Sequence, residues 1–142
     1  MRLSVSVRPG QKVSNRKDSL GVTRVQGDLR YTFRLYIVSN GRRVLGKGGA
    51  QILEAVERLG SISAAANELQ MSYRFTWNYI RRMEERLGRP VIVTRRGGAT
   101  HGRRKGGGGA KLTRIAKALL QEYRATEAKL QKELASRKLR LA

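Results

Sequence analysis

The sequence predicts a mainly α-helical domain with small β-hairpins. An alternating apolar strand over 31–37 precedes an Asn-Gly pair, and apolar residues three to four positions apart mark helices between 52 and 87. A second apolar strand at 91–94 is followed by a glycine-rich loop and a return strand at 110–112. A short helix, a tight turn and a longer helix, followed by strand, loop and strand, form the order of a winged helix-turn-helix.

The first hairpin is predicted from strict alternation. Apolar residues occupy every second position over 31–37, as they do in a half-buried strand. The pair Asn40-Gly41 is a favoured sequence for a two-residue type I′ turn, and residues 42–45 supply the return strand. We expect the glycine-rich stretch 46–49 to end that strand before the first helix begins.

Two helices are predicted next. Apolar residues over 52–59 fall on one face of a helix, and Gly60 is expected to end it. Ser63 is the expected N-cap of a short second helix over 64–69, which begins with three alanines. Small side chains on this helix allow a following helix to pack closely across it.

The third helix, 72–87, is the predicted recognition helix, whose N-terminal end we expect to enter a DNA major groove. Arg74 is expected to pair with a guanine edge or a phosphate, and Asn78 with adenine. Tyr73 is expected to bind a phosphate and Phe75 a thymine methyl, although both side chains can instead pack on a neighbouring helix. The helix N-terminus can also hold a phosphate. The predicted DNA contacts here are Ser72, Tyr73, Arg74, Phe75 and Asn78.

The glycine-rich loop within 95–111 admits two interpretations. A phosphate-cradling nucleotide loop requires a Gly-Lys-Ser/Thr ending, whereas Gly109 is followed by Ala110-Lys111. The alternative is a wing, because glycines let the backbone approach DNA closely and the surrounding cations suit a minor groove or flanking phosphates. The predicted wing contacts are Arg95, Arg96, Arg103, Arg104 and Lys105.

Three motifs carry a family resemblance: GSISAAA at 60–66, MSYRFTW at 71–77 and KGGGGAKLT at 105–113. Through them, residues 60–113 resemble the N-terminal DNA-binding domain of ModE-type molybdate-responsive regulators, and 60–87 bears a weaker likeness to LysR-type domains. The resemblance implies a winged helix that dimerises through its terminal helices, with Ser72, Tyr73 and Arg74 as DNA contacts. Such regulators sense molybdate in a separate C-terminal domain, and we expect neither that domain nor a small-molecule effector site here.

A long amphipathic helix is predicted after its expected cap, Thr113, and extends to about Ser136. Its near-heptad apolar spacing favours a partner helix, although the helix can also pack on its own domain. We therefore expect three segments: a basic flexible arm (1–28), the DNA-binding domain (29–113) and a dimerisation helix (114–142). The predicted dimer contacts are Ile115, Leu119, Tyr123 and Leu130.

The charge and the residue composition restrict which classes of function are expected. The chain holds 31 Lys and Arg against 10 Asp and Glu, a formal net charge of +21, which implies a polyanionic partner. There is no cysteine, so disulfides and thiolate sites are excluded. The single histidine, His101, lies in the wing loop, and no carboxylate cluster suggests a metal. We therefore expect no enzyme activity, no metal and no cofactor.

Together these features predict a dimeric transcription regulator that binds double-stranded DNA with sequence preference. The alternative is an abundant nucleoid or chromatin protein of low specificity, and a third possibility is RNA binding. The sequence shows no apolar run of transmembrane length and no apolar leader segment, so we expect no membrane partner and a cytoplasmic, nucleoid-associated protein.

Overall fold

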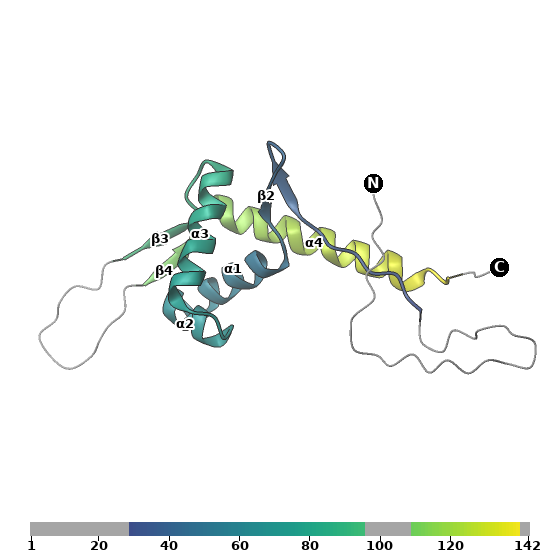
Figure 1. Cartoon of the computed structure of the whole chain (residues 1–142), viewed down its shortest axis with the longest axis horizontal. Coiled ribbons are helices and arrows are strands. Elements are labelled where there is room, and N and C mark those ends of the chain that lie inside the picture. The colour runs from purple at the N-terminus through teal and green to yellow at the C-terminus, as the bar shows by residue number, and fades with distance from the viewer. Residues whose placement is uncertain (1–28, 96–108, 140–142) are drawn as a thin grey trace, which may run out of the picture. The chain divides into compact units, whose positions relative to one another are not determined.

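The computed structural model describes residues 29–95 and 109–139 (Figure 1). The chain divides into two units, Arg34–Ala128 and a smaller one formed by Met1–Phe33 with Lys129–Ala142. All elements except the end of the last helix lie in the larger unit. The predicted basic arm lies outside the described residues.

The first hairpin pairs β1 (Ile37–Ser39) with β2 (Arg42–Leu45). Asn40 and Gly41 have φ of 48° and 74°, so both central residues are left-handed, as the predicted type I′ turn requires. The prediction of a strand over 31–37 is wrong except at Ile37. The register breaks between Ile37 and Val38, and β2 has only four residues before a helix begins, so the alternating residues before Ile37 have no ladder to join.

Helix α1 (Lys47–Leu59) begins inside the glycine stretch that we expected to precede it. A Cβ on Gly49 would lie 2.9 Å from Leu45 Cδ1 and 3.0 Å from Tyr79 Cε1, so a larger residue would require these side chains to move. Tertiary packing therefore outweighs the low helix propensity of glycine. Gly60 ends α1 in a left-handed conformation (φ 66°), as predicted.

The second helix, α2 (Ile62–Glu68), begins earlier than predicted. Ser61, not Ser63, is the N-cap, because its hydroxyl accepts a hydrogen bond from the Ala64 N–H at 3.2 Å. Ser63 consequently lies within the helix.

Helix α3 (Tyr73–Leu87) has the predicted bounds. Ser72 Oγ accepts from the Phe75 N–H at 3.1 Å, and Gly88 ends the helix with φ of 73°. Thr76, Ile80 and Met83 are buried along its inner face, as the periodicity predicts.

The second hairpin pairs β3 (Ile92–Thr94) with β4 (Ala110–Leu112), and α4 (Arg114–Ser136) follows. Side chains of α1, α3, both hairpins and α4 share one core, in which Leu45, Leu53 and Ile80 are almost fully buried. The predicted mainly α-helical fold with small hairpins is confirmed. Within the described ranges, no helix is long and apolar enough to span a bilayer.

Candidate nucleic-acid interface

A tight turn joins α2 to α3 and leaves the start of α3 on the surface. Gln70 is left-handed (φ 55°), its N–H donates to the Asn67 carbonyl at 3.1 Å, and the Met71 N–H donates to the Ala66 carbonyl at 2.9 Å. Ala65 and Ala66 are buried, so the short helix brings α3 close without large side chains between them. This geometry presents the N-terminal half of α3 to an external partner.

The predicted contacts on α3 are all exposed. Tyr73 and Phe75 retain 52% and 49% of their surface, and Ser72, Arg74 and Asn78 are exposed as well. The rings that Tyr73 and Phe75 contact, Trp77 and Tyr79, lie on α3 itself and not on a neighbouring helix.

Aromatic rings flank the outward strip of α3. Tyr73 stacks on Trp77 with centroids 6.5 Å apart and 8° between planes, while Phe75 tilts against Tyr79 at 6.3 Å. At 100° per residue, Tyr73 and Phe75 lie on opposite flanks with Arg74 between them. Trp77 is half-buried and packs against the core. The strip is thus a cation between two ring pairs, a shape suited to a base edge.

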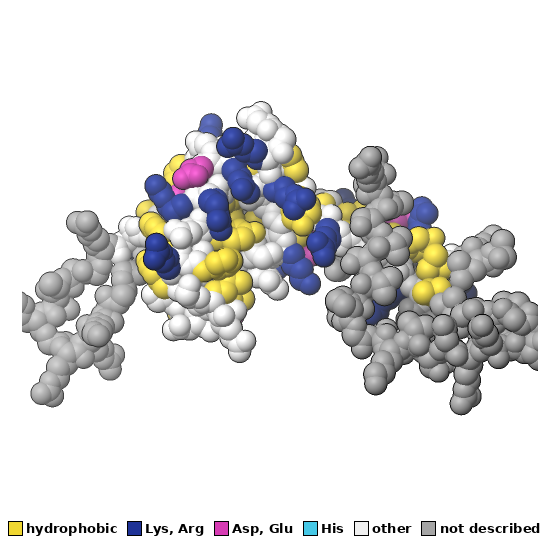
Figure 2. All heavy atoms as spheres, viewed as in Figure 1, with side chains coloured by type: hydrophobic (Ala, Val, Ile, Leu, Met, Phe, Trp, Pro, Cys, Tyr) yellow, Lys and Arg dark blue, Asp and Glu magenta, His cyan; other side chains and the backbone are white. Residues whose placement is uncertain are grey.

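The domain carries both ion-paired and unpaired cations, and on α3 itself Arg81 pairs with Glu84 at 3.2 Å. Lys117 pairs with Glu57 at 2.8 Å and Arg58 pairs with Glu68, and these contacts lower the pKa of both carboxyl groups. Among the described residues, Arg74 makes no ion pair. Figure 2 shows Lys and Arg side chains gathered over α3 and the neighbouring hairpin, with only a small acidic patch. A face with an excess of positive charge suits a phosphate backbone.

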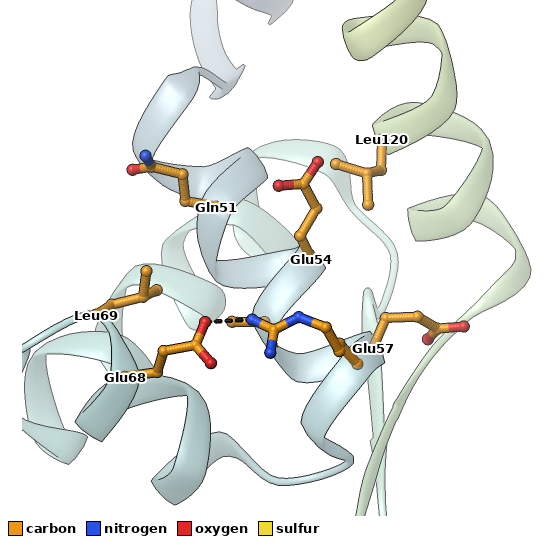
Figure 3. A pocket seen from close by; sticks show the side chains of 8 residues that line it. Gln51, Glu54, Glu57, Glu68, Leu69 and Leu120 are labelled. Atoms are coloured by element: carbon orange, nitrogen blue, oxygen red, sulfur yellow. Dashed lines mark hydrogen bonds and ion pairs between the residues drawn. The ribbon is translucent and has the colours of Figure 1, made fainter.

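A hollow of about 460 Å³ between α1, α2 and α4 offers a contrasting surface (Figure 3). Its polar lining includes Glu54, Glu57 and Glu68, together with Arg58 paired to Glu68. Each of these three carboxylates is paired with a cation, so the hollow has no excess of positive charge to attract phosphate.

The base of the second hairpin is fixed to the rest of the domain, although most of its loop lies outside the described residues. The Arg95 N–H donates to the Gly109 carbonyl at 2.7 Å, and the Ala110 N–H donates to the Gly60 carbonyl at 2.8 Å. Glu84 of α3 accepts from the Val91 N–H at 2.9 Å. Arg95 is exposed at this base. The other predicted wing contacts, Arg96, Arg103, Arg104 and Lys105, fall in the undescribed stretch 96–108.

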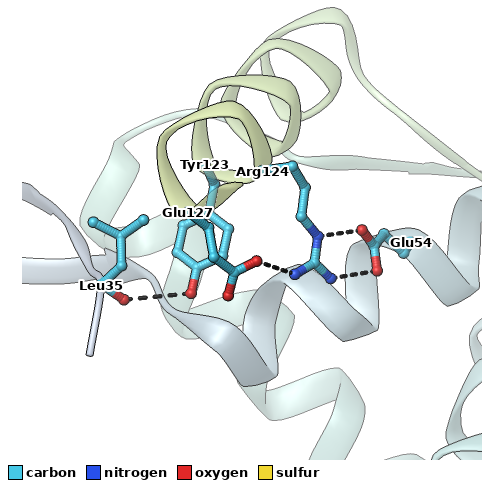
Figure 4. Close-up of polar contacts among 5 residues, drawn as sticks. All are labelled: Leu35, Glu54, Tyr123, Arg124 and Glu127. Carbon is cyan, nitrogen blue, oxygen red and sulfur yellow. Dashed lines mark hydrogen bonds and ion pairs between the residues drawn. The ribbon is translucent and has the colours of Figure 1, made fainter. Parts of the chain in front are cut away.

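The predicted dimer contacts on α4 divide into two kinds. Tyr123 is 1% exposed, and its hydroxyl donates to the Leu35 carbonyl at 3.4 Å (Figure 4). Its burial raises the pKa of the phenol. Because Tyr123 belongs to the core of its own protomer, it is not available to a partner; Ile115, Leu119 and Leu130 are half-buried and keep free surface.

Sequence reasoning missed the polar clamp beside Tyr123. Arg124 donates to both carboxylate oxygens of Glu54 on α1 and, at 2.7 Å, to Glu127 one turn further along α4 (Figure 4). These bonds raise the pKa of Arg124 above its ordinary value. Only the spacing of Arg124 and Glu127 was visible in the sequence, because Glu54 is 70 residues away.

Comparison with known proteins agrees with this architecture. Residues 49–101 match the lysR family of bacterial regulatory helix-turn-helix proteins. The molybdenum-pterin-binding protein MopB of Rhodobacter capsulatus is 39% identical over 65% of this chain and 32% of its own length. The DNA-binding transcriptional dual regulator ModE of Escherichia coli is 34% identical over 70% and 34%. The chain thus spans about a third of the length of these curated relatives.

Two solved structures are also similar. ArgP from Mycobacterium tuberculosis matches with a TM-score of 0.44 and 23% identity, over 61% of this chain and 28% of that one. A chain of the CbnR_DBD-DNA complex matches with a TM-score of 0.43 and 22% identity, over 62% and 94%. The chain is thus similar to a bacterial helix-turn-helix family over residues 49–101 and to part of the ModE and MopB proteins, and its order of elements is that of a winged helix-turn-helix.

Proposed function

We propose that this protein is a dimeric transcription regulator that binds double-stranded DNA with sequence preference. One observation carries the proposal: the N-terminal half of α3 projects a cation, an amide and aromatic rings outward, with no carboxylate neutralising Arg74 among the described residues. The recognition helix, 72–87, lies in the major groove, and the wing, 95–111, contacts the flanking backbone or minor groove.

Each exposed side chain on α3 has a distinct role in this arrangement. Arg74 donates two hydrogen bonds to the O6 and N7 of guanine, and Asn78, four residues later on the same face, pairs with adenine. Phe75 contacts a thymine methyl, while Tyr73 and the N-terminus at Ser72 bind phosphate oxygens. The backbone-positioning groups thus lie at the start of the helix, and the base-reading groups follow them along one strip.

Dimerisation places two such strips on one duplex. Ile115, Leu119 and Leu130 of α4 form the proposed contact with a second copy, because their free surface follows one side of the helix. A two-fold dimer reads half-sites about one helical turn, or about 34–36 Å, apart.

Selection of bound duplexes from a random library tests the proposal. We expect enrichment of an inverted repeat, and genome-wide mapping in the native host should then give a few sharp peaks at matching sites. Equal recovery of all sequences would contradict sequence preference.

The second candidate is a nucleoid protein of low specificity, which the net charge of +21 favours. A regulator binds its site at least about 10³-fold more tightly than random DNA. A measured ratio near one, with blanket coverage of the genome, would select this second function. Both functions predict that the affinity for DNA falls strongly with salt concentration, so the salt dependence alone does not separate them.

A further inference from the structure

Three arginines converge at the C-terminal end of α3, outside the strip described above. Arg42 and Arg43 of β2 and Arg86 of the last turn of α3 line a hollow of about 380 Å³. Arg86 Nη1 donates to the Arg43 carbonyl at 2.8 Å, which links the helix to the hairpin. The Arg43 guanidinium lies over the Tyr36 ring, 4.2 Å from its centroid, which limits its freedom.

The charge of this arginine hollow is uncompensated. Among the described residues, none of the three guanidinium groups makes an ion pair, and only arginines line the hollow. Like charges held together destabilise a domain unless an anion joins them. Guanidinium groups bind phosphate oxygens in a bidentate manner, which suits them to this task.

We propose that the arginine hollow binds a backbone phosphate of the same DNA duplex that α3 reads, as a contact separate from the wing and from the N-terminus of α3. The inference rests on the proposed function. It adds the hairpin β1–β2 to the DNA interface, in the role of a backbone clamp that carries no sequence information.

Helix geometry places the hollow where phosphates lie. Arg86 follows Arg74 by twelve residues, or about 18 Å of helix. The major groove is about 12 Å wide and about 8.5 Å deep, so a helix that reads bases with its first turns has its last turn at the groove rim. Figure 2 shows basic side chains continuing from α3 to the adjoining hairpin.

A role in holding α3 against the first hairpin explains only part of the arrangement of the three arginines. Arg86 uses one N–H to link α3 to β2, and a guanidinium has five. Arg42 and Arg43 are exposed at the hairpin end of the hollow, and among the described residues neither side chain donates a hydrogen bond to another. An external anion can therefore bind these two guanidinium groups without breaking a hydrogen bond that they donate within the described part of the chain.

The test compares two double variants that remove the same formal charge. Arg42→Ala with Arg43→Ala should lower the slope of log affinity against log salt by about 0.9, the value for one phosphate that is no longer neutralised. The fall in affinity between 50 and 200 mM salt would then be about 3.5-fold smaller than in the unmodified protein. Specific and random duplexes should be affected alike, and ethylation interference should no longer mark one phosphate position at the groove rim.

The control, Arg58→Ala with Lys117→Ala, removes two cations that are already paired with glutamates. Its slope should equal that of the unmodified protein, with thermal denaturation confirming that both variants fold. Equal salt slopes for the two double variants would contradict phosphate binding by the arginine hollow. The proposed function would stand in that case, provided that the unmodified protein binds DNA and Arg74→Ala loses sequence preference. Failure of the unmodified protein to bind duplex DNA would instead overturn the proposed function.

Discussion

Arg74 lies in the first turn of α3, exposed and, among the described residues, without an ion-pair partner. Its replacement by alanine removes a guanidinium but no core side chain, so we expect the free energy of unfolding to change by less than about 0.5 kcal/mol. If the side chain reads a guanine, the variant should lose about 1–3 kcal/mol on its preferred site, because that is the discrimination given by a bidentate pair. This corresponds to a loss of about 5- to 160-fold in affinity.

The assay is a titration of fluorescent duplexes at fixed salt, with the selected site and a scrambled site measured in parallel. Arg74→Ala should weaken the selected site much more than the scrambled one, which flattens the preference. Arg82→Ala is the matched control, since Arg82 lies two turns later on the same exposed face and is expected to contact only phosphate. Equal weakening of both duplexes by Arg74→Ala would show that Arg74 is a backbone contact and would refute the assigned role.

Three further predictions follow from other parts of the molecule. Replacing Arg103, Arg104 and Lys105 with alanine should weaken binding to all sequences. Titrations at several salt concentrations should show that the slope of log affinity against log salt falls by up to about 2.7; an unchanged slope would mean that the wing does not touch DNA. Arg124→Ala should lower the free energy of unfolding in urea by about 1–2 kcal/mol, between the values for exposed and buried pairs, since Arg124 is 33% exposed; no change would show that the clamp is not stabilising. The lowered pKa values of Glu57 and Glu68 give stability that is present above their ordinary value of 4.5 and lost as the pH falls through the folded-state values. Denaturation midpoints should therefore fall below about pH 4.5, less so in a Glu57→Gln, Glu68→Gln variant, and parallel curves for the two proteins would contradict this assignment.

Local chemistry explains which parts of the fold could be predicted. The Asn40-Gly41 turn and the Gly60 end of α1 depend on the residues themselves and their nearest neighbours, so the sequence pattern was sufficient to predict them. The start of α1 depends on contacts of Gly49 with Leu45 and Tyr79, which involve tertiary packing and outweigh propensity.

The apolar face of α4 shows a second feature that the sequence could not predict, namely which partner covers a helix. Helical periodicity indicates that one side of a helix is buried, but not what covers it. Tyr123 is covered by its own domain and hydrogen-bonded to Leu35, 88 residues away, whereas Leu119 and Leu130 on the same helix are only half covered. The exposed state of Arg74 and Asn78 was predictable because the same periodicity that buries Thr76 and Ile80 places them outward.

The last turns of α3 hold both hairpins, one on each flank. Glu84 accepts from the backbone at the base of the second hairpin, and Arg86, two residues later and about 200° around the helix, donates to the first. The bases of the two hairpins are therefore fixed on opposite sides of one helix, whose diameter of about 10–12 Å is close to the width of the major groove. Binding of the DNA backbone on both flanks, as we propose, would make the affinity depend on groove width. Duplexes altered only at uncontacted positions, so that groove width changes, should lose affinity although every base facing α3 stays the same.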